Sequence, residues 1–81
     1  MWYVYIVRCV DRTLYTGVAR DLAARIEAHN EGRGAKYTRS RRPVKLVYQE
    51  TAADRGAALR REHSIKRLTR AEKHALAKRR R

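Results

Sequence analysis

Two residues able to do chemistry lie on the apolar face of a predicted helix. Residues 22–31 predict a helix whose inward stripe runs through Leu22 and Ile26, because side chains three and four positions apart share a face. Arg25 and His29 fall on the same stripe. A charged side chain that faces the interior is costly without a partner, and a guanidinium is a planar, permanently charged donor suited to phosphate. The stripe therefore predicts a polar site, although Arg25 could also be a surface charge and His29 a polar helix end.

A carboxylate interrupts a second apolar stripe in the same way. Residues 52–67 predict another helix, on which Glu62 shares a face with Ala58 and Ile65. A single carboxylate can hold Mg²⁺ when phosphate oxygens and waters complete the octahedron, so Glu62 is a candidate metal ligand. The spacing equally allows an ion pair between Glu62 and Lys66, four residues further on. Periodicity alone leaves both roles open.

Tyrosines mark the two strands expected at the N-terminus. Tyr5 ends a Tyr-Val-Tyr tripeptide in a strand over residues 2–9, and Tyr15 begins a Tyr-Thr-Gly tripeptide in a strand over residues 14–18. Taken singly, each tyrosine is more readily explained by strand packing. A loop with an odd number of residues, or a bulge, puts both on one face of the hairpin, whereas a two-residue turn separates them. A shared site requires the first arrangement.

The elements that position these residues are bounded by capping signals. Asp21 can cap the first helix, Gly32 can end it, and Thr51 can cap the second. A third strand is expected over residues 44–49. Residues 33–43 are expected to form a loop that includes one helical turn around residues 35–39.

A capping box over residues 69–72 opens a last helix, and a basic tail is expected over about 77–81. The element order is therefore ββα-β-αα. A tight turn between the first two strands favours antiparallel pairing, so we expect an α+β fold: a small three-stranded antiparallel sheet flanked by helices, in one domain spanning residues 1–81.

The charge balance points to a polyanionic partner. The chain has 21 Lys and Arg residues against 8 Asp and Glu, a net charge of +13, and nucleic acid is the commonest polyanion inside a cell. A basic surface alone would also fit a protein that sits on anionic lipid. A loop dense in one sign of charge repels itself unless a polyanion visits it. We therefore predict nucleic-acid contacts from basic residues of the loop and the helix after the third strand: Arg33, Lys36, Arg39, Arg41, Arg42, Lys66 and Arg67.

The compartment follows from what the sequence lacks. Cys9 is the only cysteine, so no intramolecular disulfide can form, and it reads as a small buried hydrophobe. No segment approaches the roughly 18 apolar residues of a membrane span, and the apolar start has no basic region of a signal peptide. We expect a reduced, cytoplasmic protein that is a monomer or a weak dimer.

Together these motifs resemble the GIY-YIG endonuclease superfamily, most closely its small single-domain bacterial members and the N-terminal nuclease domain of the UvrC repair protein. Two tyrosine tripeptides, a helix-borne arginine and a Leu-x-x-Glu-x-x-Ile-Lys context around Glu62 carry the resemblance, which spans residues 3–68. Tyr-Val replaces the Gly-Ile of GIY, Thr16 replaces the isoleucine of YIG, and no asparagine follows Asn30.

The resemblance implies a GIY-YIG fold and metal-dependent hydrolysis of DNA phosphodiester bonds. By position, Tyr5 would be the base for the attacking water, and Tyr15 would help to order the site. Arg25 would contact the scissile phosphate, and His29 occupies a position where histidine is frequent. Glu62 would bind one divalent ion, Mg²⁺ or Mn²⁺. Tyrosine has an ordinary pKa of about 10, so Tyr5 needs a lowered pKa to act as a base, and the ion, Arg25 and the positive field push it that way.

Without a separate recognition domain, low sequence specificity is expected, with structure- or single-strand-directed cutting as possible modes. Two other function classes fit the same residues. One is a catalytically silent nucleic-acid-binding protein on this scaffold. The other is a basic accessory protein for RNA or the ribosome, for which only the charge speaks.

Overall fold

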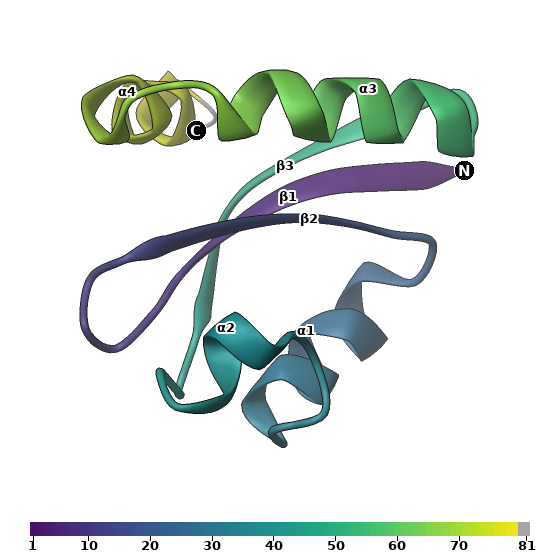
Figure 1. Ribbon diagram of the computed structural model, residues 1–81. Coiled ribbons are helices and arrows are strands. Elements are labelled where there is room, and N and C mark those ends of the chain that lie inside the picture. Colours follow the sequence, from purple (N-terminus) through teal and green to yellow (C-terminus); the bar gives the residue numbers. More distant parts are fainter. Residues whose placement is uncertain (80–81) are drawn as a thin grey trace.

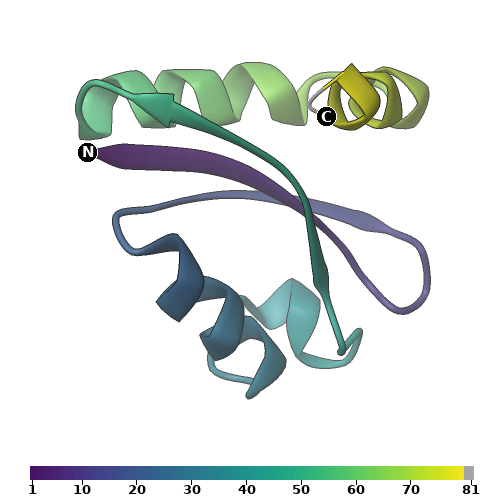
Figure 2. The same cartoon turned by 180° about the vertical axis from the view of Figure 1, so that it is seen from behind.

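A computed structural model describes residues 1–79, in which a sheet separates two pairs of helices (Figure 1). Helices α1 and α2 cover one face, while α3 and α4 lie on the other (Figures 1 and 2). No helix in this part of the chain is long and apolar enough to cross a membrane. The elements in chain order are β1 (Trp2–Arg8), β2 (Leu14–Ala19), α1 (Leu22–Asn30), α2 (Lys36–Arg39), β3 (Lys45–Ala52), α3 (Arg55–Lys66) and α4 (Arg70–Arg79).

The sheet is three-stranded and antiparallel, as predicted, with β1 in the centre and the order β2-β1-β3. Tyr5 pairs with Gly17 across the hairpin, and Val7 pairs with Tyr15. Residues 9–13 form the loop between the last paired residues, an odd number. Because side chains alternate between faces along a strand, Tyr5 and Tyr15 lie on the same face, the arrangement that a shared site requires.

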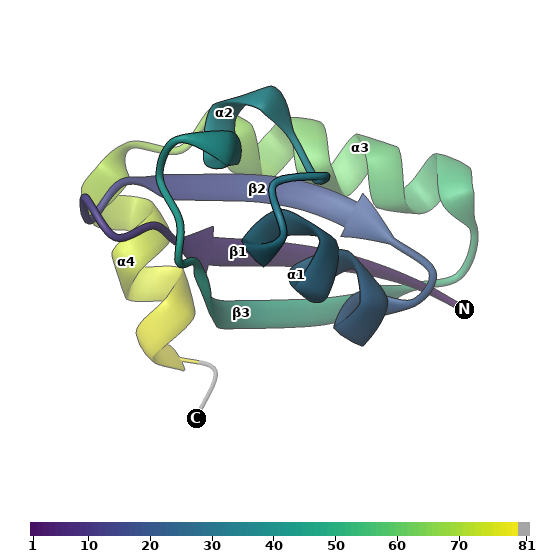
Figure 3. The same cartoon turned by 90° about the horizontal axis from the view of Figure 1, so that it is seen from below.

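The central strand is buried on both faces, which explains its continuous apolar run. Val4 and Ile6 pack toward α3 in a core cluster that includes Ile65. Tyr5 and Val7 point the other way into a second cluster, which also contains Cys9, Ala19 and Val44 and is completed by Leu22 and Ile26 of α1. One strand therefore supplies the structural core under α3 and the tyrosine face under α1; Figure 3 shows α1 crossing in front of the sheet.

The start of α3 differs from the expectation. Strand β3 continues to Ala52, which pairs with Trp2, so Thr51 is part of the strand and is not the helix cap. Helix α3 begins at Arg55, and the carboxylate of Asp54 caps it by accepting from the Ala57 amide at 2.8 Å. The end of this strand was predicted from its apolar residues, but backbone pairing with β1 continues past them.

The other caps agree with the sequence. The Asp21 carboxylate accepts from the Ala24 amide at the start of α1, and Gly32 follows α1 with a φ of 82°, a conformation that glycine adopts without strain. At α4, Thr69 and Glu72 bond each other's backbone amides, completing the predicted capping box.

The C-terminus is more helical than expected. Helix α4 runs to Arg79, so residues 77–79 are helical where a tail was predicted, and Ala77 packs against the core cluster under α3. Residues 80–81 of the predicted tail lie outside the described residues.

Candidate active site

Tyr5 is the centre of a buried polar cluster on the α1 face of the sheet. Its side chain is fully buried, and its hydroxyl lies 2.7 Å from Nε2 of His29. The Nε–H of Arg25 donates to the same hydroxyl at 3.3 Å. Arg25 and His29 are one helical turn apart on α1, so the stripe that seemed anomalous in the sequence is the wall of this cluster. Arg25 is thus not a surface charge paired with a neighbouring glutamate.

Gly17 makes room for the Tyr5 hydroxyl. A Cβ at Gly17 would lie 2.5 Å from Oη and 2.7 Å from Cζ of Tyr5, well inside any allowed contact. Gly17 is the direct cross-strand partner of Tyr5, so the tyrosine ring extends over it toward α1. The glycine of the second tyrosine tripeptide is therefore a steric requirement of the first.

His29 is held at both ring nitrogens. Its Nδ1 lies 2.8 Å from the hydroxyl of Thr38, which itself donates to the Ala35 carbonyl at 3.0 Å. Since that hydroxyl has only one proton, Thr38 accepts from Nδ1–H, and Nε2 is left to accept from the Tyr5 hydroxyl. The Ala35 amide N–H also points at Nδ1, at the longer distance of 3.4 Å, but a protonated Nδ1 cannot accept from it, so the shorter contact to Thr38 decides the tautomer. The histidine tautomer therefore suits proton transfer from Tyr5.

Neither Thr38 nor Gly34 was identified from the sequence. Thr38 is completely buried on α2, and a Cβ at Gly34 would lie 2.3 Å from Nδ1 of His29. Both residues matter because the chain folds back from α1 to α2 across the imidazole. A contact between segments that are separate in the sequence leaves no local pattern. The sequence offered only a glycine, Gly34, followed by one expected helical turn.

Burial sets the protonation of the pair. It lowers the pKa of His29, and the nearby positive charge of Arg25 lowers that pKa further. Burial also raises the pKa of Tyr5, and the hydrogen bond and charge of Arg25 oppose this only in part. Arg25 acts on the Tyr5 pKa in the expected direction, but in the protein by itself desolvation outweighs the guanidinium and the pKa is raised. At neutral pH the pair is a neutral tyrosine and a neutral histidine.

Tyr15 extends the cluster toward α2. Its ring packs edge-on against His29, with centroids 5.4 Å apart, and stacks on Tyr37 at 5.8 Å with an interplanar angle of 23°. The guanidinium of Arg41 lies 4.1 Å from the centroid of the Tyr37 ring. Tyr37 thus links the predicted site to the basic loop while its side chain stays 38% exposed.

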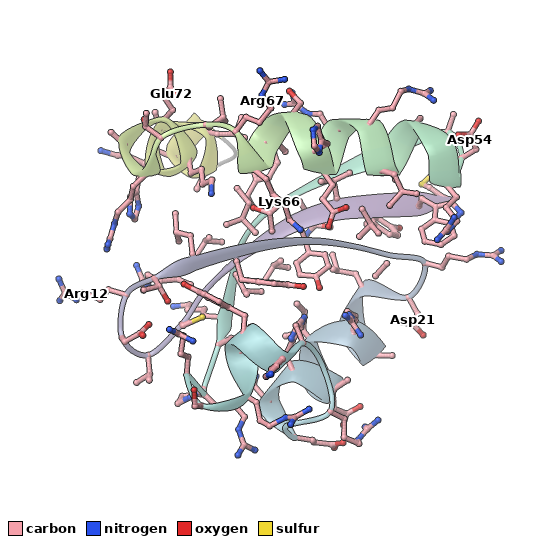
Figure 4. The ribbon with its side chains drawn as sticks, viewed as in Figure 1. Arg12, Asp21, Asp54, Lys66, Arg67 and Glu72 are labelled. Carbon is pink, nitrogen blue, oxygen red and sulfur yellow. The ribbon has the colours of Figure 1, made fainter. Side chains whose placement is uncertain are left out.

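Glu62 reaches the cluster from the other face of the sheet. Lys66 pairs with it, Nζ to Oε2, at 3.2 Å, and the same Nζ lies 5.8 Å from the centroid of the Tyr15 ring. Figure 4 shows Lys66 extending from α3 toward the sheet. The negative charge of Glu62 is among the causes that raise the pKa of Tyr5. Of the two roles left open for Glu62, the structure therefore shows the ion pair with Lys66, and its charge acts on Tyr5.

The structure thus brings all five predicted catalytic residues together, but it disperses the basic ones. Lys36 and Arg39 are exposed on α2, whereas Arg67 points away from the sheet (Figure 4). The other arginines of the loop have partners within the protein: Arg33 with Glu31, Arg41 with Asp11 at 3.0 Å, and Arg42 with the carbonyls of Arg39 and Asn30.

The site offers a divalent metal ion very few protein ligands. Within residues 1–79 no group of three or more His, Cys, Asp or Glu side chains could hold a metal. Glu62, with 18% of its side chain exposed, offers one carboxylate at the margin of the cluster. This fits Mg²⁺, which commonly takes one or two carboxylates and completes its shell with substrate phosphate and water.

A small α+β fold that gathers two tyrosines, an arginine, a histidine and a glutamate around one sheet edge defines a GIY-YIG catalytic domain. The model of that domain matches residues 1–75, and the chain belongs to the GIY-YIG family. This is a family of nucleases, so its membership implies nucleic acid as the class of partner.

The similar proteins are small members of the same family. The chain is 55% identical over 78 residues to the UPF0213 protein DP2720 of Desulfotalea psychrophila, covering 95% of this chain and 71% of that one. It is 56% identical to the UPF0213 protein SA0446 of Staphylococcus aureus, covering 96% and 95%. The solution structure of the UPF0213 protein BH0048 from Bacillus halodurans matches with a TM-score of 0.60 at 42% identity, over 96% of this chain and 84% of that one.

Proposed function

We propose that this protein is an endonuclease that hydrolyses DNA phosphodiester bonds with a divalent metal ion and with low sequence specificity. One observation carries the proposal: the Tyr5 hydroxyl lies between the neutral imidazole of His29 and the guanidinium of Arg25. A buried tyrosine with a proton acceptor on one side and a cation on the other is arranged to move a proton next to a negatively charged substrate.

The histidine removes the difficulty that a high tyrosine pKa presents. As Oη of Tyr5 takes a proton from the attacking water, its own proton passes along the 2.7 Å contact to Nε2 of His29. No free phenolate has to form, so the pKa of Tyr5 need not fall to neutrality. Thr38 keeps the ring oriented and bonds the proton on Nδ1.

Arg25 and Glu62 complete the chemistry from two sides. Arg25 places an always-charged planar donor at Tyr5, where it would neutralise charge that develops on the phosphoryl group. Glu62 would hold Mg²⁺ or Mn²⁺, which when bound supplies Lewis-acid neutralisation of the phosphate oxygens. Lys66 occupies the Glu62 carboxylate in this structure and would have to yield that position.

The proposed DNA contacts support the proposal of low sequence specificity. Lys36 and Arg39 are exposed on the single turn of α2, which also carries Tyr37, the residue that stacks on Tyr15. Such cations contact phosphates, which position a strand and carry no sequence information. Cutting directed by strand structure, or by single-stranded character, follows from this kind of contact.

The test is a cleavage assay with substitutions that keep the fold. Purified protein is incubated with labelled single-stranded, nicked, branched and duplex DNA, in Mg²⁺, Mn²⁺ or chelator. We expect metal-dependent cutting that Tyr5→Phe and Glu62→Gln each reduce by a factor of roughly 10² or more. Cutting that persists in both variants would show that this site is not the source of activity.

A second function is favoured by one contact. The ion pair between Lys66 and Glu62 neutralises the one carboxylate available to a metal, as expected for a catalytically silent nucleic-acid-binding protein on this scaffold. Tight DNA binding without cleavage of any substrate, in either metal, would select this alternative.

A further inference from the structure

A basic groove lies outside the catalytic cluster, between the end of the β1–β2 hairpin and α4. Two adjoining hollows of about 500 and 540 Å³ share three lining residues, Arg8, Lys45 and His74. The first also includes Arg12 and Arg70. Figures 1 and 3 show α4 and the hairpin turn at the same end of the molecule, away from the N-terminus, and the Arg70 guanidinium joins them by donating to the Arg12 carbonyl at 2.7 Å. We name these two hollows the hairpin groove.

Among residues 1–79, no acidic side chain lines the hairpin groove to neutralise its positive charge. Arg8 and Lys45 are direct cross-strand partners on β1 and β3, and like charges placed opposite each other destabilise a sheet. Both side chains are exposed. The nearest acid in sequence, Asp11, pairs with Arg41. Such a pair of like charges without a neutralising acid attracts an external anion.

The hairpin groove is continuous with the catalytic cluster. Arg70 also lines a smaller hollow of about 200 Å³ together with Tyr37 and Lys73. Tyr37 stacks on Tyr15, whose ring packs against His29. A chain of contacts therefore runs from the catalytic histidine, past two tyrosines, to the basic end of the hairpin. A strand that leaves the cluster on this side meets Lys73 and Arg70 before it reaches Arg8.

The lining identifies the kind of anion. Cations spaced along a path suit a polymer of phosphates more than a single compact anion. Cys9, Val10 and Pro43 provide an apolar part of the wall, against which sugars and bases can rest. Among the described residues, neither hollow is lined by a tyrosine or tryptophan, and the imidazole of His74 is the ring that both share, so a base finds little surface on which to stack.

We propose that the hairpin groove binds the phosphates of the DNA strand being cut, several nucleotides away from the scissile bond. The inference rests on the proposed nuclease function and extends its site to Arg8, Lys45, Arg70 and His74. It makes strand length a determinant of affinity: a long strand fills both regions, whereas a short one fills only the catalytic cluster. The contacts are to backbone and add affinity without sequence preference.

The test measures binding in chelator, so that it does not depend on cleavage. Fluorescence anisotropy is recorded for labelled single strands of roughly 4 and 16 nucleotides. The groove variant is Arg8→Gln with Lys45→Gln. The control variant, Arg55→Gln with Arg60→Gln, removes the same charge from exposed positions on the first turns of α3, at the end of the molecule marked by Asp54 and away from Arg12 (Figure 4).

We expect the groove variant to bind the long strand on the order of tenfold more weakly and to bind the short strand as the wild type does. For the long strand, the slope of log K against log salt concentration should become less steep by about 1.4. Each lost phosphate contact removes about 0.7 from this slope, and the variant loses two. The control should lose less on both strands. An unchanged slope, or equal losses in the two variants, would overturn the inference, because the long-range field alone would then account for binding.

Cleavage separates this inference from the proposed function. If wild-type protein cuts DNA and the groove variant binds long strands normally, the groove assignment fails and the nuclease stands. If wild-type protein cuts nothing but the groove variant loses long-strand affinity, the groove stands without the nuclease. A thermal melt of each variant verifies folding. We expect the groove variant to melt no lower than the wild type, because a repulsive cross-strand pair has been removed.

Discussion

The polar cluster depends on residues that do no chemistry as much as on those that could. Tyr5 donates to His29 and accepts from Arg25, but its position is possible only because Gly17 has no side chain. His29 in turn is oriented by Thr38. A methyl group added at Gly17 should therefore be as harmful as the loss of the Tyr5 hydroxyl, because it would displace that hydroxyl from its partners.

If the protein is the nuclease proposed above, Gly17→Ala should strongly reduce cleavage while DNA binding is retained. The added Cβ would lie 2.5 Å from Oη of Tyr5, so the hydroxyl must leave its position between Arg25 and His29. We expect cleavage to fall by a factor of roughly 10² to 10⁴, the range for losing a positioned acid–base group. Gly56→Ala on α3 is the control, since a Cβ there meets nothing closer than 3.4 Å. Wild-type turnover by Gly17→Ala would contradict the steric role.

The buried histidine predicts a loss of stability in mild acid. The pKa of His29 is lowered in the folded protein by burial and by Arg25, whereas the unfolded chain titrates near the ordinary value of about 6.5. Below that pH the unfolded state binds more protons, so the free energy of unfolding falls as pH is lowered. Urea denaturation at about pH 8 and pH 5.5 measures the change. His29→Gln should flatten it, while His63→Gln, exposed on α3, should leave it as in the wild type.

The two faces of the sheet differ in role: one packs the hydrophobic core under α3, and the other carries the polar cluster under α1. β1 supplies Val4 and Ile6 to the core under α3 and Tyr5 to the cluster under α1. Helices α1 and α2 close over the imidazole, and α3 brings Glu62 to the same edge from the opposite side. The elements on the α3 face should therefore tolerate changes that improve packing, whereas those on the α1 face should not.

Thr16 on β2 offers such a change. It stands where the family motif has isoleucine, and its buried hydroxyl has no hydrogen-bond partner among the described residues. Thr16→Val should raise the free energy of unfolding by about 1 kcal/mol, because an unsatisfied buried polar group is removed at constant shape. Thr38→Val is the matched control: its hydroxyl bonds Ala35 and His29, so the same substitution should destabilise. Chemical denaturation of both variants decides; two changes of the same sign would contradict the argument.

The cap of α3 is a second prediction at this scale. Asp54→Ala should cost about 1 kcal/mol, since the carboxylate that accepts from the Ala57 amide is lost. Thr51→Ala should cost less, because Thr51 lies in β3 and caps nothing. Both losses are measured as a lower urea concentration at the midpoint of unfolding, provided that the dependence of the unfolding free energy on urea is unchanged. Equal losses would mean that strand propensity at Thr51 matters as much as the cap.

The whole molecule is a small scaffold under strong positive charge. A net charge of +13 repels itself across principal-axis extents of 30 × 26 × 22 Å. Few internal pairs relieve this: four salt bridges are present in the described part of the chain. Net charge of this size favours a bound polyanion and works against the compact state.

Salt should therefore stabilise the folded protein. Raising NaCl from about 0.05 to 0.5 M shortens the screening length from roughly 14 to 4 Å and weakens repulsion across the molecule. We expect the melting temperature to rise with salt, and to rise less in the Arg8→Gln, Lys45→Gln variant, which carries two fewer positive charges. A melting temperature that falls with salt would show that the few ion pairs outweigh the net repulsion.

Much of the candidate site could be read from local pattern, and for a definite reason. The 3.6-residue period of a helix placed Arg25 and His29 on the inward face of α1. Side chains alternate between the faces of a strand, so an odd number of loop residues was enough for Tyr5 and Tyr15 to share a face. These are properties of a backbone with fixed periods. The strand and helix types followed in the same way, as did the caps at Asp21 and Thr69.

Tertiary structure decided what depends on residues far apart in the chain. Only the fold showed that Gly17 and Gly34 leave space for Tyr5 and His29, that Thr38 fixes a tautomer, and that burial raises the pKa of Tyr5. The sequence by itself determined which groups could do chemistry, because type and period are local. Their distances, their protonation and the path of basic residues around the hairpin were settled by packing, because desolvation and contact arise only when distant segments meet.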